Sequence, residues 1–355
     1  MQAAHPTTSI PEPVRDASSS ASSRTSADVL LRVSDLRVTL PVRGRDVDII
    51  RGVSFQLGRG EILGLAGESG SGKSVTALAL LQLLPVGAKV EGRIVFDGTD
   101  LLSLSGEALR RFRGREARIV FQDPWSSLNP MLTIGRQLRS SLTAQHEVTR
   151  AEADRRALEV LERVGIPEAK RRLKQYPHEL SGGMLQRVMI AYAIIAEPKL
   201  IICDEPTTAL DVTTEAQILD LLTDLNRELG TSLVLTSHDL GVLSDTCDQL
   251  MVMYAGRLVE QGDVGDVLGD PAHPYTQALV AAMPSHAPAP WVPLQSVPGQ
   301  PPAPGTAISG CAFAPRCPVA HERCWTASPP LDGVPGNGRR RSACWLHREP
   351  QEATS

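Results

Sequence analysis

The chain has 355 residues, of which 42% are hydrophobic, 21% charged and 4% aromatic, and its formal net charge is −4. This weakly acidic balance supplies no basic field for a phosphate backbone, which argues against a primary role in nucleic-acid binding. No apolar run reaches the roughly 18 residues that cross a bilayer, and the N-terminal residues lack the apolar centre of a secretory signal. We therefore expect a cytosolic chain that meets a membrane only peripherally.

Residues 1–28 are rich in Ser, Ala, Pro and Thr and are predicted to form a disordered tail. From residue 29 onward, alternating or continuous apolar patterns predict a series of strands. The predicted strands are 30–40, 48–57, 61–67, 92–98, 117–123, 199–206, 232–239 and a strand–turn–strand unit at 249–262.

Helical spacing replaces the strand pattern between about residues 123 and 195, which predicts a helical insert between two halves of a parallel sheet. The predicted helices are 75–84, 133–142, 150–165, 182–196 and 213–229. Because strands and helices alternate, we predict an α/β fold with a mainly parallel sheet. After about residue 270 the pattern thins into a Pro-rich stretch at 285–305, a cysteine-containing segment and a disordered end.

The segment "GESGSGKS" lies directly between a predicted strand and a predicted helix. Its glycines allow backbone N–H groups to surround phosphate oxygens at the start of a helix, so we predict a nucleotide phosphate site. Lys73 would reach the β- and γ-phosphates, and the Ser74 hydroxyl would bind Mg²⁺. The predicted ATP-binding residues are Gly67, Glu68, Ser69, Gly70, Ser71, Gly72, Lys73 and Ser74.

Polar residues end three further predicted strands. Asp204 follows "LIIC" and would hold the Mg²⁺, and Glu205 would orient or deprotonate the water that attacks the γ-phosphate. Gln122 and His238 end "RIVFQ" and "LVLTSH", where either side chain could bond the γ-phosphate or the water. We therefore predict Glu205, His238 and Gln122 as catalytic residues.

The stretch "LSGGMLQRV" places a serine and two glycines immediately before an apolar helix. Ser181 could serve only as a helix cap. Two adjacent glycines nevertheless cost helix stability of about 1 kcal/mol each relative to alanine, which suggests that something approaches this backbone closely.

Taken in order, these motifs resemble those of the ATP-binding-cassette (ABC) ATPases, over about residues 29–270. The resemblance implies a P-loop NTPase with a RecA-like parallel core, N-terminal antiparallel strands and a helical subdomain at about 123–195. It also implies a head-to-tail pair of cassettes, in which each chain's signature motif contacts the ATP of the other and Asp211 ends the D-loop. The residues so implicated are Ser181, Gly182, Gly183 and Gln186 for the signature, and Ser74, Gln122 and Asp204 for Mg²⁺.

Residues 271–355 extend the resemblance. "HPYTQALVAAMP" (273–284), "PGQPP" (298–302) and "GCAFAPRCPVAHERC" (310–324) are similar to the ATPase subunits of oligopeptide and dipeptide importers, a group that also serves nickel uptake. The implied partners are a second ATPase subunit, identical or related, two membrane permease subunits and, indirectly, an extracytoplasmic solute-binding protein, at the cytoplasmic face of the membrane. The alternative from another class is a soluble cassette ATPase acting on nucleic acid or ribosomes.

Two features leave alternatives open. The family stacks adenine on an aromatic residue, but residues 37–50 contain none, so Leu40, Arg43 or Arg45 would substitute. Cys203 and Cys247 lie in apolar surroundings and are expected to be buried. The C-terminal cysteines suit a [4Fe–4S] cluster, a zinc ion or a set of reduced thiols, with His321 and His347 as alternate ligands; they are Cys311, Cys317, Cys324 and Cys344.

Overall fold

The computed structural model describes residues 28–144, 147–208, 210–283 and 296–347. The tail predicted at 1–28, part of the Pro-rich stretch and the C-terminal end fall almost wholly outside these residues. No helix in the described ranges is long and apolar enough to cross a membrane.

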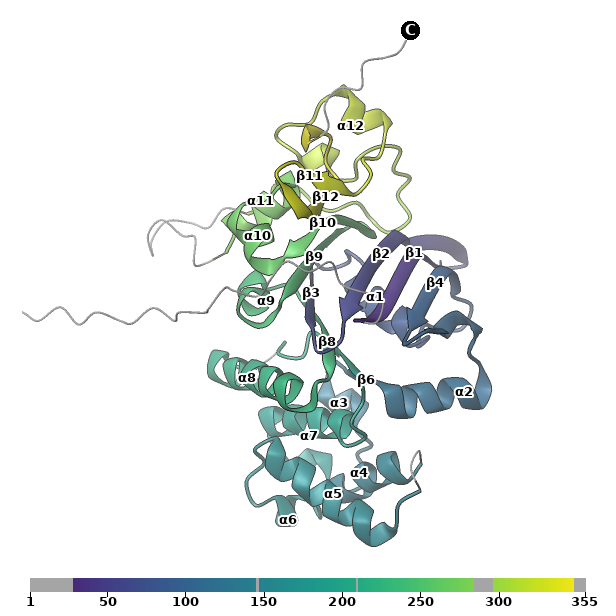
Figure 1. The fold of residues 1–355 in the computed structure, drawn as a ribbon, viewed down its shortest axis with the longest axis vertical. Helices are drawn as coiled ribbons and strands as arrows, with labels where there is room; N and C mark the ends of the chain where they lie inside the picture. The colour runs from purple at the N-terminus through teal and green to yellow at the C-terminus, as the bar shows by residue number, and fades with distance from the viewer. Residues whose placement is uncertain (1–27, 145–146, 209, 284–295, 348–355) are drawn as a thin grey trace, which may run out of the picture.

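The main sheet has eight strands in the order β11-β12-β10-β9-β3-β8-β7-β6 (Figure 1). Strands β6, β7, β8, β3 and β9 run parallel. The three central ones, β3, β8 and β7, are entirely buried because both faces of the sheet are covered. The strand bounds are β3 Ile62–Ala66, β6 Ala117–Val120, β7 Leu200–Asp204, β8 Ser232–Ser237, β9 Gln249–Tyr254, β10 Arg257–Asp263, β11 Asp332–Val334 and β12 Asn337–Ser342.

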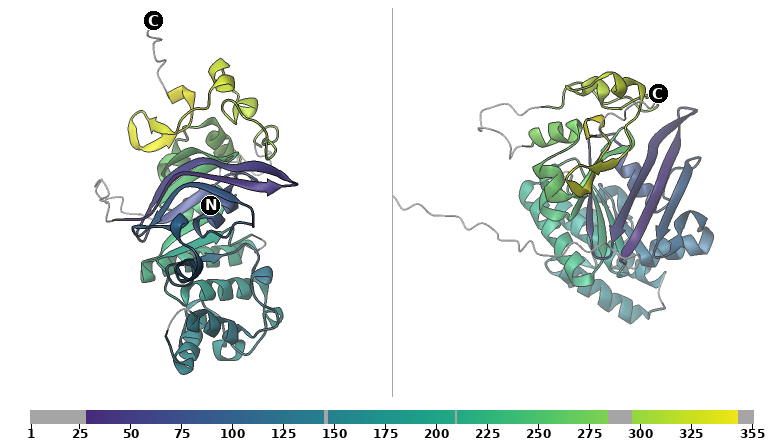
Figure 2. Two further views of the ribbon diagram at one scale, coloured as in Figure 1. Left: turned by 90° about the vertical axis from the view of Figure 1, so that its right-hand side faces the viewer. Right: turned by 45° about the horizontal axis from the view of Figure 1, so that its top comes forward.

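A second, antiparallel sheet has the order β2-β1-β4-β5 and packs beside the first (Figure 2). Its strands are β1 Val29–Val42, β2 Arg45–Gly58, β4 Lys89–Phe96 and β5 Thr99–Asp100. Alternate residues of β1 and β2 are buried, and together with α1 (Lys73–Leu80) they form one of the two hydrophobic clusters. The predicted α/β fold with a parallel core and N-terminal antiparallel strands is confirmed.

Helices separate β6 from β7 in the sequence and form one end of the molecule (Figure 1). Thr133 and Thr149 cap the two longer amphipathic helices by accepting hydrogen bonds from the amides of the third helical residues. The apolar faces pack on α7 in the larger hydrophobic cluster. These helices are α3 Pro124–Ser127, α4 Ile134–Thr143, α5 Arg150–Arg163, α6 Ala169–Arg172 and α7 Gly182–Ile194.

The C-terminal segment is built onto the main sheet at the opposite end (Figure 1). β12 pairs with β10, placing Ser342 opposite Glu260, so ladder hydrogen bonds cross the boundary expected near residue 270. The remaining helices are α2 Gly106–Arg111, α8 Val212–Leu229, α9 Leu240–Thr246, α10 Val264–Gly269, α11 Pro274–Ala281 and α12 Glu322–Thr326.

Candidate nucleotide-binding and hydrolysis site

The glycine-rich loop connects the buried strand β3 to helix α1. Gly67 has φ +146°, and a Cβ there would collide with the carbonyl oxygen of Met253; Gly72 caps α1 with φ +111°. Both positions therefore require glycine. The Ser71 hydroxyl is buried and has no hydrogen-bond partner among the described residues, whereas Ser69 and Gly70 are exposed. A glycine-dependent loop with a buried, unpaired hydroxyl at the start of a helix fits a phosphate group.

Lys73 is the first residue of α1, and its side chain is buried within this loop. Its Nζ donates to the carbonyl oxygens of Gly67, at 2.7 Å, and Glu68, at 3.3 Å, and lies 3.6 Å from Oε1 of Glu205. Burial lowers the pKa of Lys73, and the carboxylates of Glu205 and Asp204 oppose that shift. The ammonium group is thus held at the point where the loop and the end of β7 meet.

Asp204 ends β7 and is almost fully buried. Its Oδ1 accepts hydrogen bonds from the hydroxyls of Ser74, at 2.9 Å, and Thr236, at 2.8 Å. The hydroxyl and carboxylate oxygens predicted to bind Mg²⁺ are therefore brought together, and such oxygens suit that ion. Sequence reasoning assigned no role to Thr236, although it belongs to the "TSHD" motif.

The predicted catalytic residues Gln122 and His238 both contact the carboxylate of Glu205. Its Oε2 accepts hydrogen bonds from Nε2 of Gln122 and Nδ1 of His238, each at 3.3 Å. Thr208 donates to the same oxygen at 3.1 Å. The residues meet because the carboxyl ends of the adjacent parallel strands β6, β7 and β8 share one edge of the sheet. Glu205 has φ +48°, an uncommon backbone conformation for glutamate, and it turns the side chain toward these groups.

The serine–glycine turn begins helix α7. The Ser181 hydroxyl accepts a hydrogen bond from the amide of Met184 at 3.4 Å, so Ser181 does cap the helix. A Cβ at Gly183 would lie 2.9 Å from Cγ2 of Thr214, so packing against α8 explains why position 183 is a glycine. No atom of the described residues lies within 4 Å of a Cβ at Gly182, so packing among those residues does not explain the glycine at 182.

Asp211 lies beside this turn. It caps α8, accepting from the amide of Thr214 at 3.0 Å and from its hydroxyl at 2.7 Å, and these hydrogen bonds lower the pKa of Asp211. Gln186 is only 1% exposed, and its Nε2 has no hydrogen-bond partner among the described residues. A contact between Gln186 and another chain stays a prediction.

The residues suggested to replace an adenine-stacking aromatic lie on the β1–β2 hairpin. Leu40 is half-buried on β1, whereas Arg43 and Arg45 are exposed around the hairpin turn. Farther along β2, Ile50 meets the loop, because a Cβ at Gly72 would lie 2.7 Å from its Cδ1. An adenine contact for the first three residues stays a prediction.

The four C-terminal cysteines line a single small cavity of about 20 Å³, and His321 also lines it. The amide of Cys311 donates to the carbonyl oxygen of Cys324 at 2.8 Å, and burial raises the pKa values of the Cys317 and Cys344 thiols. Within the described ranges, no group of three or more His, Cys, Asp or Glu side chains is arranged to hold a metal ion. His347 Nε2 instead donates to a backbone carbonyl at 2.7 Å.

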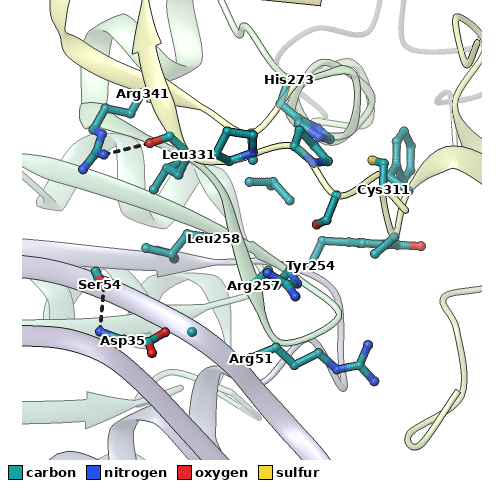
Figure 3. A pocket seen from close by; sticks show the side chains of 18 of the residues that line it. Asp35, Arg51, Ser54, Tyr254, Arg257, Leu258, His273, Cys311, Leu331 and Arg341 are labelled. Atoms are coloured by element: carbon teal, nitrogen blue, oxygen red, sulfur yellow. Dashed lines mark hydrogen bonds between the residues drawn. The ribbon is translucent and has the colours of Figure 1, made fainter. Parts of the chain in front are cut away.

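The sequence did not indicate a pocket of about 290 Å³ between the antiparallel sheet, β9–β10 and the C-terminal segment (Figure 3). Arg51, Arg257 and Arg341 line it, and burial together with the nearby charge of Arg51 lowers the pKa of Arg257. Tyr254 and Cys311 form another part of its wall. The pocket marks the junction of the C-terminal segment with the nucleotide-binding part of the chain.

The chain matches two known families. Residues 50–208 match the family described as "ABC transporter", and residues 259–324 match the family "Oligopeptide/dipeptide transporter, C-terminal region". Among solved structures, the dimeric post-hydrolysis state of the ATP-binding cassette MJ0796 bound to ADP and Pi is similar, with a TM-score of 0.60 and 28% identity. That similarity covers 66% of this chain and 99% of the other.

Curated relatives are similar over most of the chain. It is 45% identical over 319 residues to the oligopeptide transport ATP-binding protein OppD of Escherichia coli (strain K12), which covers 90% of this chain and 94% of that protein. It is 46% identical over 304 residues to OppD of Bacillus subtilis (strain 168), covering 85% of each. The chain therefore belongs to the ABC transporter family, within its group of oligopeptide and dipeptide transport ATP-binding subunits.

Proposed function

We propose that this chain hydrolyses ATP to energise a membrane importer of peptides, working as one of two paired cassettes at the cytoplasmic face of the membrane. The observation that carries the catalytic assignment is the convergence of Lys73, Asp204 and Glu205 at one sheet edge. The names of the relatives, which are oligopeptide transport ATP-binding proteins, support peptides as the solute. They give no support to the alternatives of a nickel importer or an ATPase acting on nucleic acid or ribosomes.

The proposed chemistry follows from the positions of the side chains. The loop amides and Lys73 would bind the phosphates, while Ser74, Asp204 and Gln122 would hold Mg²⁺, which would supply positive charge that offsets the charge of the phosphates. Glu205 orients the attacking water and accepts its proton, and His238 stabilises the γ-phosphate.

Pairing would complete the site. Packing among the described residues does not explain Gly182. Gly182 and the exposed Ser181 would present a bare backbone and a hydroxyl to the ATP on the other cassette. The partner cassette is a second copy or a related subunit, and the two permease subunits receive the motion through the helices at 124–194. A solute-binding protein outside the membrane delivers the peptide to those permeases.

The test of the catalytic assignment is Glu205→Gln, compared with Glu197→Gln as a matched control. Glu197 shares the left-handed backbone conformation (φ +49°) but is exposed and lies on the loop before β7. We expect Glu205→Gln to lower steady-state ATP turnover by about 10²- to 10⁴-fold while nucleotide-dependent pairing persists. Near-normal turnover in this variant would contradict the role of Glu205, and failure of the chain to pair with itself or a related subunit would contradict the paired-cassette proposal.

We further propose that the C-terminal cysteines ligate a [4Fe–4S] cluster. Four thiols line one cavity, and their irregular spacing suits such a cluster better than a zinc ribbon. Because the described side chains are not arranged to hold a metal ion, cluster binding would draw the thiols closer together. Binding would require loss of the thiol protons that burial now favours.

Metal and sulfide analysis of anaerobically purified protein, with its optical spectrum, separates the alternatives. Four iron and four sulfide per chain support the cluster, one zinc per chain supports a zinc site, and neither supports free thiols. The last two results would each overturn the cluster proposal.

A further inference from the structure

Arg316 connects the cysteine segment to the phosphate-binding loop. It lies between Cys311 and Cys317 in the sequence, and its side chain is only 4% exposed. Its two terminal nitrogens donate to both carboxylate oxygens of Glu68, at 2.6 Å and 2.9 Å. Glu68 is the second residue of "GESGSGKS", so a bidentate ion pair joins positions 248 residues apart.

The remaining donors of Arg316 are also used. Nε donates to the carbonyl oxygen of Pro298 at 2.6 Å, and the terminal nitrogens reach the Tyr254 hydroxyl at 3.2 Å and the Val297 carbonyl at 3.3 Å. The guanidinium also lies over the rings of Tyr254 and Phe313, at 5.7 Å and 5.8 Å from their centroids. Arginine has five N–H donors in a rigid plane, and here five hydrogen bonds fix its orientation.

The C-terminal segment also holds the backbone of Glu68. Its amide donates to the Tyr275 hydroxyl at 2.9 Å, and Tyr275 packs against Tyr254 and Phe313 with ring centroids 4.6 Å and 5.3 Å away. The carbonyl of Glu68 accepts from Lys73 at 3.3 Å. One residue of the loop is thus bonded through its side chain and amide to the C-terminal segment, and through its carbonyl to the phosphate-binding lysine.

We propose that Arg316 is a positioning residue for ATP binding, which neutralises Glu68 and fixes the phosphate-binding loop from the cysteine segment. The proposal rests on the ATP-binding function proposed above. Without Arg316, an uncompensated carboxylate would stand in the loop that receives the negatively charged phosphates. A displacement of the turn from Cys311 to Cys317 would move Arg316 and thereby change ATP affinity.

The experiment measures binding of a non-hydrolysable ATP analogue to the purified full-length chain, together with the KM and kcat of ATP hydrolysis. We expect Arg316→Met to weaken analogue binding and raise KM on the order of tenfold, as one uncompensated charge of like sign in a partly buried site would do, with a smaller change in kcat. Glu68→Gln alone should lose less affinity than Arg316→Met, because it breaks the ion pair without leaving an unpaired carboxylate in the loop. The double variant should recover affinity to within about threefold of the wild type, because the repelling charge is then absent.

The matched control is Arg340→Met. Arg340 is similarly buried in the C-terminal segment, but it bonds to Asp270 and to the Asp266 carbonyl and has no contact with the loop. Its substitution should leave analogue affinity within twofold of the wild type.

Three results would overturn the inference: wild-type affinity in Arg316→Met, a double variant as weak as Arg316→Met, or an equal loss in Arg340→Met. The second and third results would indicate that binding fails through general loss of structure. If the wild-type chain itself fails to bind the analogue, the proposed ATP-binding function fails and this inference fails with it.

Discussion

Replacing Thr236 by valine tests how the buried Asp204 is held. Thr236 is 0% exposed, and valine preserves its shape while removing the hydroxyl. That hydroxyl donates to Asp204 Oδ1 at 2.8 Å and accepts from the Glu205 amide at 3.0 Å. The amide also donates to the Thr236 carbonyl at 3.2 Å and keeps that partner, so the principal loss is the bond to the carboxylate.

The size of the effect follows from the charge of the acceptor. A hydrogen bond to a charged group contributes about 1.5–3 kcal/mol to stability. In Thr236→Val, Asp204 keeps only one of its two hydroxyl donors, Ser74, so we expect the free energy of unfolding to fall by about 2 kcal/mol. Thr236→Ser keeps the hydroxyl and loses one methyl group, which costs about 1 kcal/mol. The stability order should therefore be threonine, then serine, then valine.

Urea unfolding followed by tryptophan fluorescence measures this order, and titration of ATPase activity with Mg²⁺ measures the effect on the site. The valine variant should require more Mg²⁺ for half-maximal activity, because the carboxylate has lost a group that orients it. A valine variant as stable as the wild type, or more stable than the serine variant, would refute the reasoning.

Three further predictions concern buried or tightly packed positions. Gly183→Ala should lower the free energy of unfolding by about 1–3 kcal/mol, because its Cβ would press on Thr214. Gly182→Ala should leave the free energy of unfolding unchanged and reduce only ATP turnover. Equal unfolding midpoints of the two variants in urea would contradict this difference. Burial lowers the pKa of His273 to about 3, so the unfolded chain binds a proton that the folded chain does not as pH falls below about 6.5. Its contribution to stability should therefore fall by about 2 kcal/mol between pH 7 and pH 5, and His273→Asn should remove that part of the pH dependence in urea titrations. Burial raises the pKa of Cys203, on β7, to about 12, so iodoacetamide at pH 8 should modify this thiol only after denaturation. Mass spectrometry detects the modification, and labelling of the native protein would show that β7 opens.

Most of the residues that the structure brings together at the candidate site could be named from the sequence, because their signals are local. Gly67, Lys73 and Ser74 belong to a strand–loop–helix unit whose spacing alone implies phosphate binding. Glu205 and His238 could also be assigned to this site, because the apolar patterns predicted the strands that they follow. Parallel strands place their carboxyl ends at one edge of a sheet.

Other residues have no such local signal. Gln186 stands near the serine–glycine turn in the sequence, but the rotation of α7 turns its side chain inward. Thr236 looks like an ordinary strand residue until the neighbouring strand places Asp204 against it.

The amino-acid order was sufficient for the fold class and for naming the candidate residues of the glycine-rich loop, since short-range geometry decides both. The tertiary structure alone decided that Arg316 reaches Glu68, that β12 extends the main sheet beside β10 and that four distant cysteines share one cavity. Such contacts depend on how separate elements pack, and no periodicity within either segment encodes its distant partner.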